Sequence, residues 1–178
     1  MRSNDVGWKL AYLAAGAAVF LLDQASKAWA RKTLELGREI NVIPNFLNFI
    51  YAKNTGVAFS QFNNGGEFGR WMLAALAGAA ALAVLYYFWR TPNSYDRILG
   101  ACALLLAGIV GNLADRVRLG YVIDFIDVQF GDWHYPTFNV ADSAICLGAA
   151  LLIVDLLFFQ KRESGNKKLE VKNEKLIE

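Results

Sequence analysis

The chain has 178 residues, of which 56% are hydrophobic and 19% are charged, whereas an average soluble domain is about 45–50% apolar and about 25% charged. The net charge of +2 is too small to indicate a nucleic-acid partner. The single histidine and the two cysteines, Cys102 and Cys146, lie far apart in the sequence, which argues against a zinc site and against a disulfide framework. The composition therefore indicates one membrane domain, for which we expect no metal and no cofactor.

Four apolar stretches are candidates for membrane-spanning helices, each of which needs about 20 mostly apolar residues. In chain order they are residues 10–30, 71–89, 98–113 and 140–159. The second stretch is rich in alanine around Gly78, which favours close packing against another helix. An even number of spans places both termini on the same side of the membrane.

The first stretch also has the features of a cleaved signal peptide. Arg2 and Lys9 precede the apolar residues 10–22, and Ala28-Trp29-Ala30 forms a small-x-small pattern of the kind found at cleavage sites. On these features alone, the stretch is either a retained first helix or a leader that is removed.

The connections between the spans differ in character. Residues 90–97 form a short turn, whereas residues 31–68 and 121–130 carry β-branched and aromatic residues with Asn and Gly between them, as strands do. We therefore expect a small sheet on one face of the membrane. Lys and Arg are slightly more frequent at the termini and in the 90–97 turn than in the long loops, which favours cytoplasmic termini and an extracytoplasmic sheet.

The chain divides into a membrane part and a tail. Residues 1–160 are expected to form one four-span domain. Residues 161–178 are rich in Lys and Glu and have no large apolar face, so they are expected to form a mobile cytoplasmic tail.

Polar side chains within or next to the spans are candidate functional residues, because a charge at the centre of a span costs about 2.5–3.5 kcal/mol. They are Asp23, Lys27, Asn112, Asp115, Arg116, Asn139, Asp142 and Asp155. Asp23 and Lys27 have the spacing and order of a helical ion pair, although Lys27 could also extend to the membrane surface. Asp155 is expected to reach water at the cytoplasmic headgroups.

Two acids flank one outer loop. Asp124 and Asp142 lie at the two ends of a segment that returns to the same membrane face, so their carboxyl groups can meet. Paired carboxyl groups share a proton, and one can then act as a base toward water while the other acts as an acid toward the leaving amine. A serine nucleophile is not indicated, because no serine has a histidine beside it in the sequence, and His134 is interpreted as a lone loop residue.

A third acid at this end of the chain has a different expected role. Asp115 lies next to Arg116, and an adjacent cation keeps a carboxylate ionised. We therefore expect the two residues to form a structural clasp at the end of the third span, with a solvated helix end as the alternative. Asp124 has only apolar neighbours beside it and no cation within five residues, which favours a raised pKa and a catalytic role.

Five short blocks resemble, in this order, the motifs of the lipoprotein signal peptidases, the aspartic signal peptidase II family. The blocks are DQASK (23–27), NTGVAF (54–59), GNLADR (111–116), VIDFI (122–126) and FNVAD (138–142). The resemblance covers about residues 10–160 and leaves out the tail. It also favours a retained first helix, because DQASK lies before any cut after Ala30 and would be lost with the leader.

The resemblance implies a membrane all-α fold with four transmembrane helices, a small extracytoplasmic β-sheet and a short helix. It implies an aspartic endopeptidase of the bacterial cytoplasmic (inner) membrane, with its active site near the outer face. The substrates would be prolipoproteins, cut just before a diacylglyceryl-modified cysteine, and membrane lipid would be a further partner. Globomycin-type cyclic peptides would inhibit the enzyme, and we expect a monomer.

The family's functional residues can be assigned to this chain where its motifs match. The catalytic pair is then Asp124 and Asp142. The positions expected to support this pair or to line the substrate channel are Asp23, Lys27, Asn54, Gly56, Asn112, Asp115, Arg116, Asn139 and Ala141. Neutral amides such as Asn54 suit the orientation of an acid or of a peptide backbone, and Gly56 permits close approach of the backbone.

Two other classes of protein fit a four-span chain: a proton-coupled carrier that uses Asp23, Asp115 and Asp142 as a relay, and a non-catalytic assembly factor. A carrier should have polar residues at mid-span and often an internal repeat, whereas here the second span has no charge and the acids cluster at one depth. An assembly factor has no need of an acid pair. The sequence therefore favours the peptidase.

Overall fold

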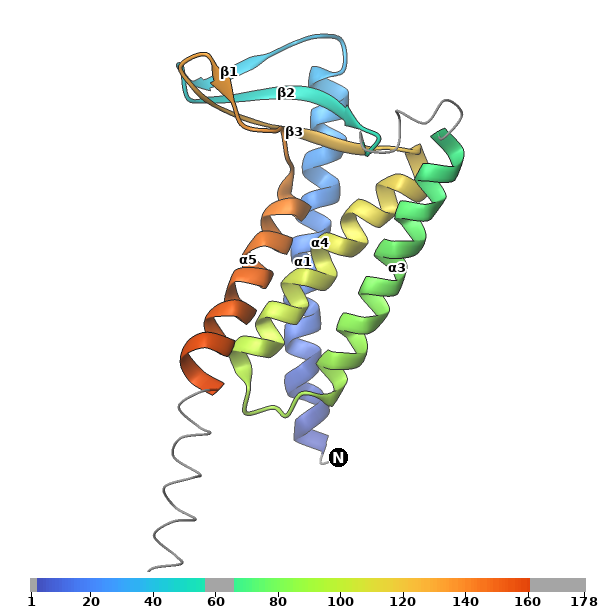
Figure 1. Cartoon of the computed structure of the whole chain (residues 1–178), viewed down its shortest axis with the longest axis vertical. Coiled ribbons are helices and arrows are strands. Elements are labelled where there is room, and N and C mark those ends of the chain that lie inside the picture. The colour runs from blue at the N-terminus through green and yellow to red at the C-terminus, as the bar shows by residue number, and fades with distance from the viewer. Residues whose placement is uncertain (1–2, 57–65, 161–178) are drawn as a thin grey trace, which may run out of the picture.

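The computed structural model describes residues 3–56 and 66–160, in which four long helices stand side by side at one face of a small antiparallel sheet (Figure 1). The helices are α1 (Ser3–Leu34), α3 (Gly66–Arg90), α4 (Asp96–Leu119) and α5 (Val140–Val154), and α5 continues into a π-helical segment, η1 (Asp155–Gln160). The strands are β1 (Ile40–Ile43), β2 (Leu47–Asn54), β3 (Val122–Phe130) and β4 (Trp133–His134).

The four predicted spans are confirmed. Helical segments long and apolar enough to cross a membrane are Val6–Leu34, Glu67–Arg90, Asp96–Leu119 and Val140–Phe158. The third span is longer than predicted, because α4 does not stop at residue 113 but continues to Leu119. It ends at Gly120, whose φ of 87° is a left-handed conformation that glycine adopts without steric cost. The polar residues of GNLADR (111–116) therefore lie on the last turns of a helix.

Helix α4 is the centre of the bundle: it packs against α1, α3 and α5 and is the most buried of the four spans. Glycine permits its close approach to α5, since a Cβ at Gly108 would overlap the carbonyl oxygen of Ala141, and one at Gly148 would lie 2.8 Å from the carbonyl oxygen of Ala101. The close packing expected around Gly78 is not found at that glycine, where a Cβ would meet no described atom within 4 Å. Among the described residues, glycines that permit close approach lie instead where α4 meets α5 and where α4 meets α1, since a Cβ at Gly16 would lie 2.9 Å from the carbonyl oxygen of Ala103.

The sheet has the order β1-β2-β3-β4 with every pair antiparallel, which confirms the predicted small sheet. It packs on the end of α1 through a buried cluster of Ala30, Leu34, Ile123 and Phe125. No separate short helix accompanies the sheet within residues 3–56 and 66–160, and residues 57–65 of the predicted outer loop lie outside the described residues. The predicted tail, 161–178, also lies outside them.

Candidate active site

The two acids predicted to pair, Asp124 and Asp142, are connected through two asparagine side chains at the junction of β3, α4 and α5. Asn139 Nδ2 donates a hydrogen bond of 2.6 Å to Asp124 Oδ1, and Asn112 Nδ2 donates one of 2.7 Å to Asp142 Oδ1. The two amides also contact each other, with 3.2 Å from Asn139 Nδ2 to Asn112 Oδ1. The carboxyl groups therefore face one network of amide donors, although they lie on different elements.

The fold places Asp142 by capping the start of α5. The side chain of Asn139 accepts a hydrogen bond from the Asp142 amide at 2.9 Å, and the Asp142 carboxylate accepts one from the Asn139 amide at 3.2 Å. This reciprocal arrangement is a capping box, which satisfies backbone donors at a helix start and fixes both side chains. The sequence block FNVAD therefore caps α5 and also positions the carboxyl groups of Asp142 and Asp124.

Strand β2 supplies the second amide that contacts Asp124. Asn54 Nδ2 donates to Asp124 Oδ2 at 3.0 Å, and Asn54 Oδ1 in turn accepts a hydrogen bond from the Gly56 amide at 2.9 Å. Gly56 has a φ of +80°, which other residues adopt only with strain. The glycine turn therefore holds the Asn54 side chain in the orientation in which it reaches the acid.

Lys27 is buried among acids rather than extended to the membrane surface. Its Nζ lies 3.0 Å from Asp23 Oδ2 and 3.0 Å from Asp115 Oδ2, and it donates to Asn112 Oδ1 at 2.9 Å. The Asp23–Lys27 ion pair is therefore confirmed, and the alternative of an extended lysine is wrong, because the side chain is only 2% exposed. Asn112 joins this lysine cluster to Asp142.

The two carboxylates that hold Lys27 also reach the elements that carry the acid pair. Asp23 Oδ1 accepts the backbone N–H of Ala141 at 2.9 Å, and Asp115 Oδ2 accepts the backbone N–H of Ile123 at 3.2 Å. Ala141 precedes Asp142, and Ile123 precedes Asp124. The lysine cluster therefore fixes the backbone immediately before each acid.

Asp115 and Arg116 do not form the expected ion pair with each other, although Asp115 does hold the segment that follows α4, through the backbone N–H of Ile123. Residues adjacent on a helix point in different directions, and Asp115 turns inward to Lys27. Arg116 Nη1 instead donates to the carbonyl oxygen of Asn112 at 3.3 Å, and its guanidinium interacts electrostatically with Asp124 and Asp142 as well as with Asp115. Arg116 is therefore a cation beside the acid pair, whereas Asp115 belongs to the lysine cluster.

The carboxyl group of Asp124 lies outside the membrane-spanning helices and is almost fully buried. Burial raises its pKa from the ordinary value of 3.8 to about 6, and the nearby charge of Asp142 acts in the same direction. The hydrogen bonds from Asn54 and Asn139 and the charge of Lys27 oppose the rise. The predicted upward shift of the pKa is therefore confirmed, and Asp124 can hold or release a proton near neutral pH.

Two ionisable residues outside the cluster differ from expectation. Asp155 does not reach water: it is 3% exposed, and its Oδ1 lies 3.0 Å from Arg97 Nε at the opposite end of the bundle. His134 is not a lone loop residue, since it lies in β4 with its Nδ1 2.9 Å from Asp127 Oδ1. In both cases the partner lies on a different element, Arg97 on α4 and Asp127 on β3, and the sequence pattern did not predict the contact.

One residue in contact with the cluster was missed. Gln24 Nε2 donates to Asp23 Oδ2 at 3.1 Å and to Asp115 Oδ1 at 3.4 Å, and Gln24 Oε1 accepts from Arg118 Nη1 at 3.2 Å. In DQASK the charged residues Asp23 and Lys27 stand out, whereas the neutral amide of Gln24 does not. The signal available was the position of Gln24 next to Asp23 within a block already singled out.

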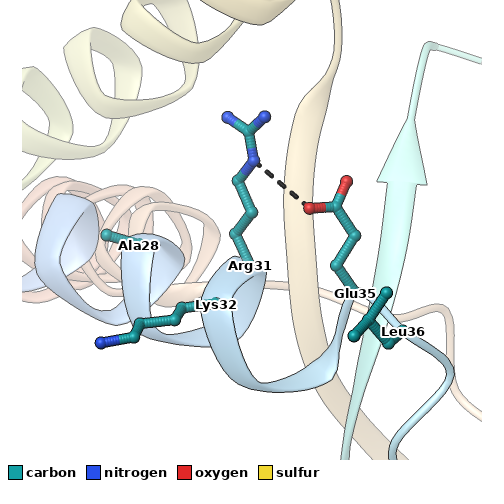
Figure 2. A pocket seen from close by; sticks show the side chains of 5 residues that line it. All are labelled: Ala28, Arg31, Lys32, Glu35 and Leu36. Carbon is teal, nitrogen blue, oxygen red and sulfur yellow. Dashed lines mark hydrogen bonds and ion pairs between the residues drawn. The ribbon is translucent and has the colours of Figure 1, made fainter.

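A hollow of about 460 Å³ opens at the end of α1 that meets the sheet (Figure 2). It is lined by Ala28, Arg31, Lys32, Glu35 and Leu36. Arg31 Nε lies 3.4 Å from Glu35 Oε2, as Figure 2 shows, and both side chains are solvent-accessible. None of these residues is among the predicted site residues, so the hollow does not identify the site.

Comparisons with known proteins agree on one family. A family model described as signal peptidase (SPase) II matches residues 15–158. The chain is 42% identical to "Lipoprotein signal peptidase" of Alteromonas mediterranea, over 90% of this chain and 85% of that protein. It is 44% identical to "Lipoprotein signal peptidase" of Teredinibacter turnerae, over 80% of this chain and 84% of that one.

Solved structures agree with the fold. One described as a "Bacterial membrane enzyme structure by the in meso method at 1.9 A resolution" has a TM-score of 0.73 and 32% sequence identity, and the match covers 84% of this chain and 94% of that one. A second, described in the same words at 2.3 A resolution, has a TM-score of 0.72 and 31% identity, and the match covers 88% and 91% of the two chains. The similarity therefore extends over all four spans.

Proposed function

The chain belongs to the signal peptidase II family as a multi-pass bacterial membrane protease, and on this premise we propose that it removes the signal peptide from prolipoproteins by cutting just before a diacylglyceryl-modified cysteine. The observation that carries the proposed chemistry is the amide network that joins two acids: Asn139 on Asp124 and Asn112 on Asp142, with the amides in contact.

The proposed mechanism is aspartic. Asp124 and Asp142 share one proton, because two carboxylates held close together do not both ionise at low cost. The ionised member takes a proton from water, which attacks the carbonyl carbon of the scissile peptide, and the protonated member donates its proton to the leaving amine.

The buried lysine cluster supports this role without touching the substrate. Asp23 and Asp115 each accept a backbone N–H directly before one acid, and Lys27 neutralises part of their charge. Charged groups in such a site need a preorganised surrounding, because a displacement of about 1 Å can cost about 10²-fold in rate. We assign Asp23, Lys27 and Asp115 to this positioning role.

The depth of the acids suits a lipid-anchored substrate. Asp142 lies at the start of α5 and Asp124 in β3, at the end of the bundle that the sheet covers (Figure 1). A diacylglyceryl group holds its cysteine near the headgroups, so the scissile bond lies at the level of the helix ends. We place this end at the outer face of the inner membrane, with globomycin-type peptides binding there and the enzyme acting as a monomer.

The direct test is incubation of the purified enzyme with a prolipoprotein whose cysteine carries diacylglyceryl, followed by detection of the smaller product and of its new N-terminus. Cleavage is expected before the modified cysteine, and the same precursor without the lipid should remain uncut. The Asp142→Asn enzyme is the matched control, since asparagine preserves the size of the side chain. Cleavage at another peptide bond, or equal cleavage of the unmodified precursor, contradicts the proposal.

A further inference from the structure

We propose that Arg70, near the start of α3, is a positioning residue for peptide-bond cleavage, which it supports by holding the outer end of α4. The proposal rests on the proposed function, because the α4 end in question carries residues of the candidate active site. Arg70 lies in none of the five sequence blocks and contacts neither acid of the pair in any hydrogen bond.

The side chain of Arg70 binds the last carbonyl groups of another helix. Its Nε donates to the carbonyl oxygen of Arg116 at 2.8 Å, and its Nη2 donates to the carbonyl oxygen of Val117 at 2.7 Å. The last four carbonyls of a helix have no partner within the helix; that of Arg116 also accepts the backbone N–H of the cap residue Gly120 at 3.1 Å. A cation is favoured at this end by the helix dipole. Two short hydrogen bonds from one rigid guanidinium also fix direction, which a single bond does not.

The segment held in this way leads to both halves of the site. Arg116 itself reaches the carbonyl oxygen of Asn112, one turn earlier on α4, and Asn112 contacts Asp142. In the other direction the chain turns at Gly120 and enters β3, where Asp124 lies. A Cβ at Gly120 would lie 3.7 Å from the Arg70 side chain, so Arg70 also packs against this turn.

Arg70 is itself fixed by its neighbours on α3. Glu67 Oε1 lies 3.1 Å from Nη1, and the guanidinium lies 4.9 Å from the centre of the Trp71 ring. One turn further along α3, Leu73 Cδ1 occupies the space beside Gly56, the residue that orients Asn54. The first turns of α3 therefore contact the support of Asp124 from two sides, through α4 and through Gly56, which follows β2.

The alternative to positioning is a purely structural role, in which Arg70 only adds to the stability of the α3–α4 contact. The two roles differ in what they change. A structural loss lowers the fraction of folded enzyme and leaves each folded molecule as active as the parent. A positioning loss lowers kcat per folded molecule, because a small displacement of the end of α4 is enough to slow the chemical step. Such a displacement should leave substrate binding intact, so KM for the lipid-anchored substrate should change little.

The test uses the full-length enzyme and the diacylglyceryl-modified prolipoprotein, with Arg70→Gln, Arg70→Lys and the control Arg90→Gln. Arg90 is a suitable control because it lies at the other end of α3 and also packs on an aromatic ring, that of Tyr86. We expect kcat of Arg70→Gln to fall about 10-fold or more with KM within about twofold, partial recovery in Arg70→Lys, and parental kinetics in Arg90→Gln.

Each outcome decides the proposal. Parental kcat in Arg70→Gln overturns it, as does a loss of activity that disappears once rates are divided by the folded fraction from a melting curve. If Arg70→Gln does not fold, Arg70→Lys decides: a reduced kcat per folded molecule supports positioning, and a parental kcat rejects it. Failure of the parent enzyme to cut the precursor would instead reject the proposed function and is seen before any variant is made.

Discussion

Lys27 and Asp115, which belong to α1 and α4, form an ion pair with 3.0 Å between Nζ and Oδ2, and both side chains are almost fully buried. Asp115 uses the same oxygen to accept the backbone N–H of Ile123. The pair therefore joins the first span to the third and connects both to the strand that carries Asp124. A buried charge of this kind is stable only while its partner remains.

Removal of Lys27 should therefore damage stability and turnover together. In Lys27→Met, Asp23 and Asp115 face each other without a cation, and we expect a loss of about 3–5 kcal/mol in the free energy of unfolding. Asp23→Asn should cost less, because Lys27 keeps Asp115. Thermal melting in detergent measures both, and Arg31→Gln, which breaks an exposed pair, should change stability by about 1 kcal/mol or less. A Lys27→Met enzyme as stable as Arg31→Gln would contradict this account.

The raised pKa of Asp124 should make the stability of the protein depend on pH. A carboxyl whose pKa rises on folding binds its proton more tightly in the folded state, so its stabilising contribution is complete below pH 3.8 and is lost as the pH rises through about 6. Asparagine cannot ionise. The free energy of unfolding of Asp124→Asn, relative to the parent, should therefore increase by about 3 kcal/mol between about pH 3.5 and about pH 8.

Turnover on the same Asp124→Asn protein is expected to be abolished, as in Asp142→Asn, whereas Asp115→Asn should lose stability along with activity. Melting curves across the pH range and rates at one pH measure these differences. A stability difference that does not change with pH would reject the raised pKa of Asp124, and substantial turnover by Asp124→Asn would remove it from the catalytic pair.

Two substitutions of Asn139 should distinguish its role in capping α5 from its hydrogen bond to Asp124. Asn139→Ser keeps a side-chain oxygen that can cap α5, whereas Asn139→Ala removes the cap and should cost about 1 kcal/mol more. Neither variant retains the Nδ2 that donates to Asp124 at 2.6 Å, so both should lose most of their turnover. If Asn139→Ser is as active as the parent, the amide donor is not needed for the chemistry.

The ion pair at the other end of the bundle should affect stability alone. Arg97→Gln leaves the buried Asp155 without the contact at 3.0 Å from Nε, and the free energy of unfolding should fall. Because this pair lies at the opposite end of the helices from the acids, kcat per folded molecule should stay within about twofold of the parent. A twofold change in kcat corresponds to a change of less than about 0.5 kcal/mol in the activation free energy. A specific loss of kcat would show that the two ends are coupled.

The proposed orientation can be tested by labelling. Single cysteines at Trp133, in β4, and at Asn93, in the turn between α3 and α4, are placed in a chain whose Cys102 and Cys146 are replaced by alanine. A reagent that does not cross the membrane should label position 133 from outside intact cells and should label position 93 only after permeabilisation. The reverse pattern would move the acid pair to the cytoplasmic face.

Several features of this protein follow from the sequence alone. Apolar run length determines the spans, because a bilayer sets the same length for every helix that crosses it. The β-branched and aromatic residues around Asp124 predicted a strand, and β3 covers Val122–Phe130. The acids Asp124 and Asp142 could be paired in advance, since the loop between them starts and ends at the same membrane face.

The partners of the buried charged side chains were decided only by the tertiary structure. From neighbours in the sequence, Asp115 should pair with Arg116, Lys27 should have one acid, and Asp155 should reach water. Helix geometry points adjacent side chains apart, and packing brings Lys27 to Asp115 and Arg97 to Asp155 from other helices. A short-range pattern carries no information on such contacts, because they depend on how three helices approach one another, which is set here by glycines such as Gly108.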